Sequence, residues 1–189
     1  MVRLVEQNPW MLYGGPPEMR GNRAAVLAAV RQAGNLLKEA APALRGDIEV
    51  VMAAVTQQGA ALQYASAEAR NDRGVVLAAI RQHPGAVRHA SAALRADRDV
   101  MLEAVRLNPV NLEHASAELR ADASFVDQAV KQNPHTLAYA SDNLRWDRKV
   151  ALDVVDRNKY AIQHVHNALR ADHEVLVHAG VKTWHEEEW

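Results

Sequence analysis

Seven arginines recur at a spacing of 25 residues, from Arg20 to Arg170, and an aspartate or asparagine follows each of them two positions later. Guanidinium groups bind phosphates and carboxylates through paired N–H donors, so such a row could form a series of anion sites. Because carboxylates stand beside six of the seven arginines and on adjacent repeats, we interpret the row as structural pairing and helix capping instead. This arginine–aspartate ladder contains Arg45 and Asp47, Arg70 and Asp72, Arg95 and Asp97, Arg120 and Asp122, and Arg145 and Asp147.

A second row places one ring-bearing side chain in each of five consecutive repeats. On a helical wheel this position lies roughly 120° from the centre of the apolar face, at an edge where rings could line a groove. The row is therefore a candidate peptide-binding ridge, and the alternative is that each ring stacks on its neighbour and seals the array. The members of this ring ladder are Tyr64, His89, His114, Tyr139 and His164.

A third row varies from repeat to repeat at a position that the helical pattern leaves exposed. Its members, which we call the variable stripe, are Arg31, Thr56, Arg81, Arg106, Lys131 and Asp156. Four of the six are basic, so the stripe predicts a protein or peptide partner with an acidic surface.

Other chemistry has little support in the residues. Serines recur at Ser66, Ser91, Ser116 and Ser141, where a helix-capping role explains them without a nucleophile. Equivalent histidines on stacked helices lie about 8–10 Å apart, too far to share one metal ion. No metal-binding or phosphate-binding motif is present. We therefore expect no enzymatic activity, no cofactor and no metal.

Composition limits the class of protein further. The formal charge is −1, so no large positive surplus is available for a nucleic-acid backbone. The chain contains no cysteine, which excludes disulfides and thiolate metal sites. The longest strongly apolar run, residues 24–30, is far shorter than the roughly 20 residues that span a bilayer, and residues 1–13 lack a signal-peptide pattern. These features predict a cytoplasmic protein without a membrane segment.

The elements that carry these rows are short helices. In the repeat that starts at Arg95, Asp97 is placed to cap a first helix, and Asn108-Pro109 ends it and opens a second. Ser116 is placed to cap a last short turn. The apolar positions of the first helix cover an arc of roughly 200°, so it must pack on both sides, as stacked repeats allow.

We therefore predict an all-α fold: an α-solenoid, or superhelical array, of about seven 25-residue repeats, each with two short helices. Residues 1–189 form one domain in this interpretation, with a partial first repeat at 1–19 and full repeats from 20, 45, 70, 95, 120 and 145. A capping repeat and tail occupy 170–189, where Gly180 interrupts the apolar pattern.

The repeat pattern resembles the family grouped as domain of unknown function 4116. The pieces that carry the resemblance are Val75-Val-Leu-Ala-Ala-Ile80, Leu112-Glu-His-Ala-Ser116 and Leu144-Arg-Trp-Asp147, and the family unit spans two 25-residue turns. The chain departs from the pattern at Val165-His166 and at Gly180. The resemblance implies a helical repeat of bacterial type and supplies no activity or catalytic residue.

The sequence thus predicts a protein-interaction or scaffolding module. The alternative from another class is a nucleic-acid-binding superhelix that uses a basic face, which the charge balance disfavours. The sequence leaves the oligomeric state and the identity of any partner open.

Overall fold

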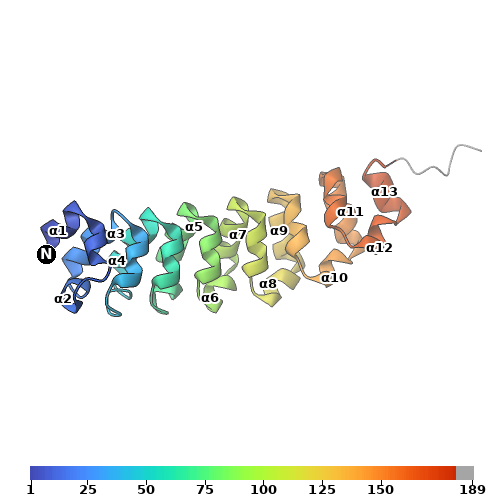
Figure 1. Cartoon of the computed structure of the whole chain (residues 1–189). Coiled ribbons are helices and arrows are strands. Elements are labelled where there is room, and N and C mark those ends of the chain that lie inside the picture. The colour runs from blue at the N-terminus through green and yellow to red at the C-terminus, as the bar shows by residue number, and fades with distance from the viewer. Residues whose placement is uncertain (182–189) are drawn as a thin grey trace, which may run out of the picture. The chain divides into compact units, whose positions relative to one another are not determined.

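The computed structural model describes residues 1–181, and within this range it contains helices and turns but no strand. One main α-helix recurs in each repeat and begins three residues after the ladder arginine. In the first part of the chain, successive main helices lie side by side (Figure 1). The main helices are α1 (Val2–Gln7), α3 (Arg23–Val30), α4 (Ile48–Gln57), α5 (Arg73–Gln82), α7 (Arg98–Leu107), α9 (Ala123–Gln132), α11 (Arg148–Arg157) and α13 (His173–His178).

The second helix of each repeat is a 3₁₀ helix, and a third, one-turn segment follows it, so the prediction of two helices per repeat was incomplete. The 3₁₀ helices are η1 (Pro9–Leu12), η2 (Gly34–Glu39), η3 (Gly59–Tyr64), η5 (Pro84–His89), η6 (Pro109–His114), η7 (Pro134–Tyr139) and η8 (Lys159–His164). Six residues span about 12 Å as a 3₁₀ helix but about 9 Å as an α-helix. The longer form better matches the ten-residue α-helix, about 15 Å long, on which it packs.

The one-turn segments carry the ladder arginines. They are α2 (Pro17–Arg20), η4 (Ala69–Asn71), α6 (Ala92–Arg95), α8 (Ala117–Ala121), α10 (Asp142–Arg145) and α12 (Asn167–Arg170). Arg45 lies in a turn instead of a helical segment. Within each unit, main-chain bonds link such segments to the next: Ser66 N–H donates to the Arg45 carbonyl at 2.8 Å, and Ser91 N–H to the Arg70 carbonyl at 2.9 Å. The ladder position therefore connects repeats through its backbone.

The capping residues start the main helices as local chemistry predicts. The carboxylate of Asp72 accepts the Val75 N–H at 2.9 Å, and that of Asp97 accepts the Val100 N–H at 2.9 Å. A carboxylate at this place satisfies a free N–H and interacts favourably with the helix dipole. Capping therefore explains why an aspartate stands here in six of the seven ladder steps.

The core runs through the repeats as two adjacent stripes on each main helix. In α5, Val75, Val76, Ala79 and Ile80 are all fully buried. This spacing of i, i+1, i+4 and i+5 covers too wide an arc for one contact face, so the helix packs against a neighbour on each side. Stability consequently depends on contacts between repeats rather than on single helices.

Contacts divide the chain into two compact units, one from Met1 to Asn111 and one that begins at Leu112. The 25-residue register continues through both. In the second unit, Gly180 ends α13: at φ 69° it lies in the left-handed region, while the N–H groups of Gly180 and Val181 bond to the carbonyls of Val177 and Leu176. This Schellman motif explains why glycine interrupts the apolar pattern. The rest of the tail, residues 182–189, lies outside the described residues.

Candidate binding surface

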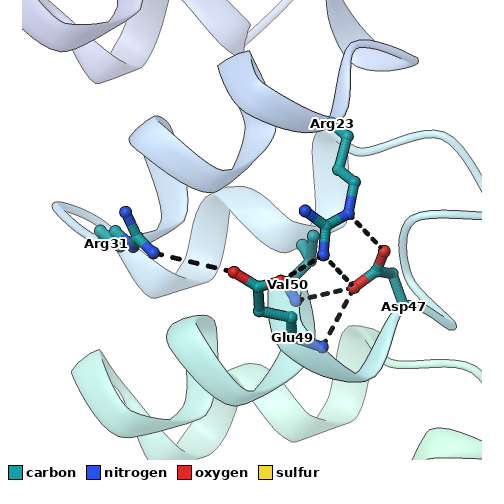
Figure 2. A network of polar contacts seen from close by, with 5 residues as sticks. All are labelled: Arg23, Arg31, Asp47, Glu49 and Val50. Carbon is teal, nitrogen blue, oxygen red and sulfur yellow. Dashed lines mark hydrogen bonds and ion pairs between the residues drawn. The ribbon is translucent and has the colours of Figure 1, made fainter.

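Three ladder aspartates, Asp47, Asp97 and Asp172, form ion pairs with arginines other than those of the ladder. Arg23 Nε lies 2.7 Å from Asp47 Oδ2, and its Nη2 lies 2.5 Å from Glu49 Oε2 (Figure 2). The hydrogen bond from Arg23 lowers the pKa of Asp47. Arg23 opens the main helix of the preceding repeat, so its side chain lies beside the start of the next main helix. The predicted pairing of ladder arginine with ladder aspartate was therefore wrong for Asp47.

The same clamp, an arginine held by two acids of the following repeat, recurs elsewhere in each unit. In the first unit, Arg73 contacts Asp97 at 3.6 Å and Asp99 at 3.1 Å. In the second, Arg148 Nε lies 3.0 Å from Asp172 Oδ2, and Glu174 is its other partner. The clamp joins neighbouring repeats at the start of their main helices.

In the second unit, the guanidinium groups of Arg145 and Arg170 instead lie near the C-terminal end of η8. The Nε atoms of Arg70 and Arg120 are buried and have no hydrogen-bond partner among the described residues. Arg170 Nε donates to the Val165 carbonyl at 2.8 Å, and Arg145 Nε approaches the His164 carbonyl at 3.5 Å. The last carbonyls of a helix have no partner within the helix, and a cation there is favourable. These contacts give Arg145 and Arg170 a structural role.

Every member of the variable stripe is exposed, yet most of its charges have partners. Arg81 lies 3.5 Å from Glu103, and Arg106 lies 2.9 Å from the same carboxylate. The hydrogen bond from Arg106, followed by that from Arg81, lowers the pKa of Glu103. In the second unit, Lys131 lies 2.6 Å from Asp127, and Asp156 is paired with His178 at 2.5 Å. The stripe is therefore less basic than its sequence suggests.

Arg31 and Arg81 are the most available cations of the stripe. Arg31 reaches Glu49 only at 3.9 Å, while Arg23 holds the same carboxylate at 2.5 Å (Figure 2). The side chains of Arg31 and Arg81 are 63% and 67% exposed. Exposed pairs of this kind contribute about 0–1 kcal/mol, so both guanidinium groups can exchange their partners at little cost.

Beside Arg31, the outer face of α4 forms an open groove of about 660 Å³. Its apolar surface comes from Ile48, Met52 and Ala53, and Ile48 is 43% exposed. Arg31, Glu49, Thr56 and Gln57 complete the lining. The groove thus brings together Arg31 and Thr56 of the variable stripe with an apolar strip that the sequence analysis did not identify.

The ring ladder is half-buried, and in the second unit its rings have different partners from those predicted. The ring of His164 contacts His135, at the start of the preceding 3₁₀ helix, with centroids 4.8 Å apart. Arg88 Nε donates to His89 Nε2 at 2.9 Å in the first unit. His114 lies 3.3 Å from the adjacent Glu113, whereas Tyr64 and Tyr139 are half-buried in their 3₁₀ helices. For His164, the alternative of stacking on its ladder neighbour, Tyr139, was wrong, because the ring contacts His135 instead.

Burial, together with the charges of His135, Arg170 and Arg145, lowers the pKa of His164. His135 Nδ1 and His164 Nε2 are only 2.7 Å apart. Histidines at equivalent positions of neighbouring repeats would lie about 8–10 Å apart. His135 and His164 are not equivalent, because they are separated by one repeat plus four residues, and they can therefore lie closer together. Within residues 1–181, however, no group of three or more histidine, aspartate or glutamate side chains could hold a metal ion.

The departure from the repeat pattern at His166 is compensated locally. His166 Nδ1 accepts the Ala168 N–H at 3.2 Å, so it caps α12 as Ser91 caps α6 and Ser116 caps α8. The capping role predicted for Ser141 was wrong, because its side chain makes no such bond at α10. Trp146 stacks on the His166 ring with centroids 3.5 Å apart. Four earlier repeats carry a glycine, asparagine or alanine at the position of Trp146 and a serine at the position of His166. The tryptophan and the histidine therefore occur together as a replacement for that pair.

In the second unit, α9 and α11 border a crevice of about 240 Å³. Val126, Val130 and Val154 line it, and Asp127 lies at its edge. The other repeats carry an apolar side chain at the position of Asp127, namely Leu27, Met52, Leu77, Leu102 and Leu152. Asp127 instead bonds to Lys131 and Arg157, and both contacts lower the pKa of Asp127. The crevice follows from the missing leucine.

Replacing Asp127 by leucine is expected to fill the crevice and stabilise the second unit by about 1 kcal/mol. Burying a leucine side chain gains about 1.5–3 kcal/mol, of which partial exposure removes a share. The exposed ion pairs that are lost contribute about 0–1 kcal/mol. Urea unfolding followed by circular dichroism measures the change, with Asp127→Asn as the control that removes the charge without filling space. Equal stability of the two variants would contradict this account.

The described residues contain no helix long and apolar enough to cross a membrane. Comparison with curated proteins and with solved structures finds no significant match. The family model described as a domain of unknown function (DUF4116) matches residues 47–95 and 97–145, which together exceed half of the chain. Each match runs from a capping aspartate to the ladder arginine two repeats later, as expected if the family unit holds two turns. The chain therefore belongs to the DUF4116 family.

Proposed function

We propose that this protein is an interaction module without catalytic activity of its own, and that it binds a partner protein through the groove on α4. The observation that carries the proposal is an apolar strip, in which Ile48 is exposed and Met52 and Ala53 are half-buried, beside the available cation of Arg31. Exposed apolar surface at the centre with polar groups at the rim is typical of protein-binding sites. The role of a scaffold would follow from several such contacts along the array.

The chemistry of the groove favours an amphipathic helical segment with acidic residues at its sides. Its apolar side chains would contact Ile48 and Met52, and its carboxylates would pair with Arg31 and with Arg81 on the next main helix. Such helices commonly bind in shallow apolar grooves through residues spaced i, i+3, i+4 and i+7. Arg81 and Arg106 share the single carboxylate of Glu103, which leaves one positive charge there to balance.

Nucleic-acid binding has less support because most cations of the stripe already contact carboxylates. A phosphate backbone would have to displace Glu103 and Asp127 from their arginine and lysine partners. Binding of DNA or RNA at low ionic strength that weakens steeply with salt would favour this alternative.

Replacing Ile48 by arginine is expected to weaken the binding of such a segment at least tenfold without unfolding the protein. Arginine already occupies this position in other repeats, at Arg23, Arg73, Arg98 and Arg148, so the fold accommodates it. The new charge would interrupt the apolar strip. The measurement is fluorescence anisotropy of a labelled helical peptide with leucines on one face and glutamates on both sides.

Ala123→Arg is the matched control, because residue 123 is the corresponding position in the second unit and also departs from arginine. It should bind the peptide like the wild type. Absence of binding to the wild type would exclude this partner chemistry, and equal weakening in both variants would show that the α4 groove is not the site.

A further inference from the structure

Two imidazole rings from successive repeats meet at one point of the second unit. His135 is the second residue of η7, and His164 is the last residue of η8. His135 Nδ1 lies 2.7 Å from His164 Nε2, and the ring planes are inclined at 73°. The two nitrogens share a hydrogen bond, so a rotation of the rings is enough to let both nitrogens face one cation.

We propose that this histidine pair binds a divalent transition-metal cation, with Cu²⁺ as the best fit. Imidazole nitrogens bind such ions at about 2.0 Å. Two nitrogens at adjacent corners of a square-planar site are then about 2.8 Å apart, whereas a tetrahedral site requires about 3.3 Å. The observed separation of 2.7 Å is that of the hydrogen bond in the metal-free pair, and a small ring movement brings the nitrogens to a ligand spacing. Among divalent ions of the first transition row, Cu²⁺ binds imidazole sites most tightly.

Metal binding here needs no net loss of a proton. In the metal-free pair one ring donates its N–H to the other ring, so one of the two facing nitrogens carries a proton. When the metal binds, that ring moves the proton to its other nitrogen, and both facing nitrogens become ligands. Binding of the cation therefore breaks one hydrogen bond between the rings and does not displace a charged group.

The surroundings leave the pair accessible and set a moderate affinity. His135 is exposed, while His164 is half-buried and is held by its 3₁₀ helix. The guanidinium groups of Arg145 and Arg170 contact the carbonyls of His164 and Val165 rather than the ring nitrogens. Within residues 1–181 no third histidine or carboxylate completes a metal cluster, so water would fill the remaining coordination positions.

The test is a Cu²⁺ titration of the full chain at neutral pH, followed by calorimetry and by electron paramagnetic resonance. We expect one site per chain with two nitrogen ligands, and at least tenfold weaker binding of Zn²⁺, as the general affinity order predicts. His135→Asn and His164→Tyr should each weaken Cu²⁺ binding at least tenfold. The array already holds these residues at the corresponding positions, as Asn35 and as Tyr64 and Tyr139, so both variants should fold.

His83→Asn is the control for binding by other histidines, and Asn108, Asn133 and Asn158 stand at its position in later repeats. It should leave the affinity for Cu²⁺ unchanged. The proposal is overturned if His83→Asn weakens binding as much as His135→Asn does, or if the wild type binds Cu²⁺ no more tightly than the variant that carries both His135→Asn and His164→Tyr. These results are independent of peptide binding at the α4 groove.

Discussion

Alanine in place of Gly59 is expected to destabilise the first unit by about 3 kcal/mol. A Cβ atom at this position would lie 2.4 Å from the carbonyl oxygen of Ala79 on the next main helix, so backbone would have to move. Forced overpacking of this kind costs about 1–3 kcal/mol. The shift would also disturb the bond that the Gly59 N–H donates to the side-chain oxygen of Gln82. Both effects act on the contact between neighbouring repeats.

Gly34 provides a second case in the same unit, because its added Cβ would lie 2.3 Å from the Ala54 carbonyl oxygen. The control is Gly85→Ala. A Cβ there would meet only the His83 ring, at 3.3 Å, and Ala60 occupies the corresponding position one repeat earlier. We expect this control to change the free energy of unfolding by less than about 1 kcal/mol. The urea midpoints of the three variants measure these changes in stability. Similar losses of stability for Gly59→Ala and Gly85→Ala would rule out the close approach of the added Cβ to the Ala79 carbonyl as the cause.

The repeat architecture could be predicted from sequence because its signals are local. The carboxylate of Asp72 and the N–H of Val75 that it caps are three residues apart, so the helix start can be recognised in one short segment. The choice of a 3₁₀ helix for η3 could not be recognised in this way. It depends on the length of the main helix on which the segment packs, which is a property of the assembled repeat.

The candidate groove could not be recognised from the pattern within one repeat, because its key residue differs from the other repeats only in side-chain type. Ile48 replaces the clamp arginine of other repeats, and Gly74 then stands where the acid partner would be. Clamp arginines and acids occur together 26 residues apart in Arg23 with Glu49, Arg73 with Asp99 and Arg148 with Glu174, and both are missing at Ala123 with Lys149. Arg98 with Ser124 is the exception. A comparison of residues 26 positions apart in successive repeats reveals the ion pairs. It also reveals the repeat in which Ile48 replaces the arginine and leaves an apolar surface.

The variable stripe shows a different limit of sequence reasoning. Its exposure follows from helical periodicity, and every member is exposed in the structure. Its net charge depends on side chains of neighbouring helices, such as Glu103 beside Arg81, which no single-helix pattern contains. The histidine pair was missed for the same reason, since its members lie 29 residues apart and at different positions of the repeat.

Aspartate in place of Asn111 is expected to destabilise the first unit by about 4 kcal/mol at neutral pH. Asn111 is buried, and its amide nitrogen donates to the carbonyls of Pro84 at 3.0 Å and Ala104 at 2.9 Å. A carboxylate has the same shape but no donor, so a charge would face two carbonyl oxygens without water. Burying an uncompensated charge typically costs about 3–5 kcal/mol.

The penalty at position 111 should depend on pH in a direction that identifies its cause. Burial and the two carbonyls would raise the pKa of the new carboxyl in the folded protein above the unfolded value of about 3.9. The folded state would then bind a proton more tightly than the unfolded chain, so the variant recovers stability as the pH falls toward 4 and loses it as the pH rises through the folded pKa. Urea unfolding at pH 4.5 and pH 7.5 measures this difference.

Asn108→Asp is the matched control for this measurement. Asn108 uses only its side-chain oxygen, which accepts the Val110 N–H at 3.1 Å, and a carboxylate can keep that bond. The control should therefore unfold at nearly the same urea concentration as the wild type at both pH values. If Asn111→Asp were equally unstable at pH 4.5 and pH 7.5, loss of shape complementarity rather than a buried charge would have to explain its effect, and the amide of Asn111 would not serve as a donor between two repeats.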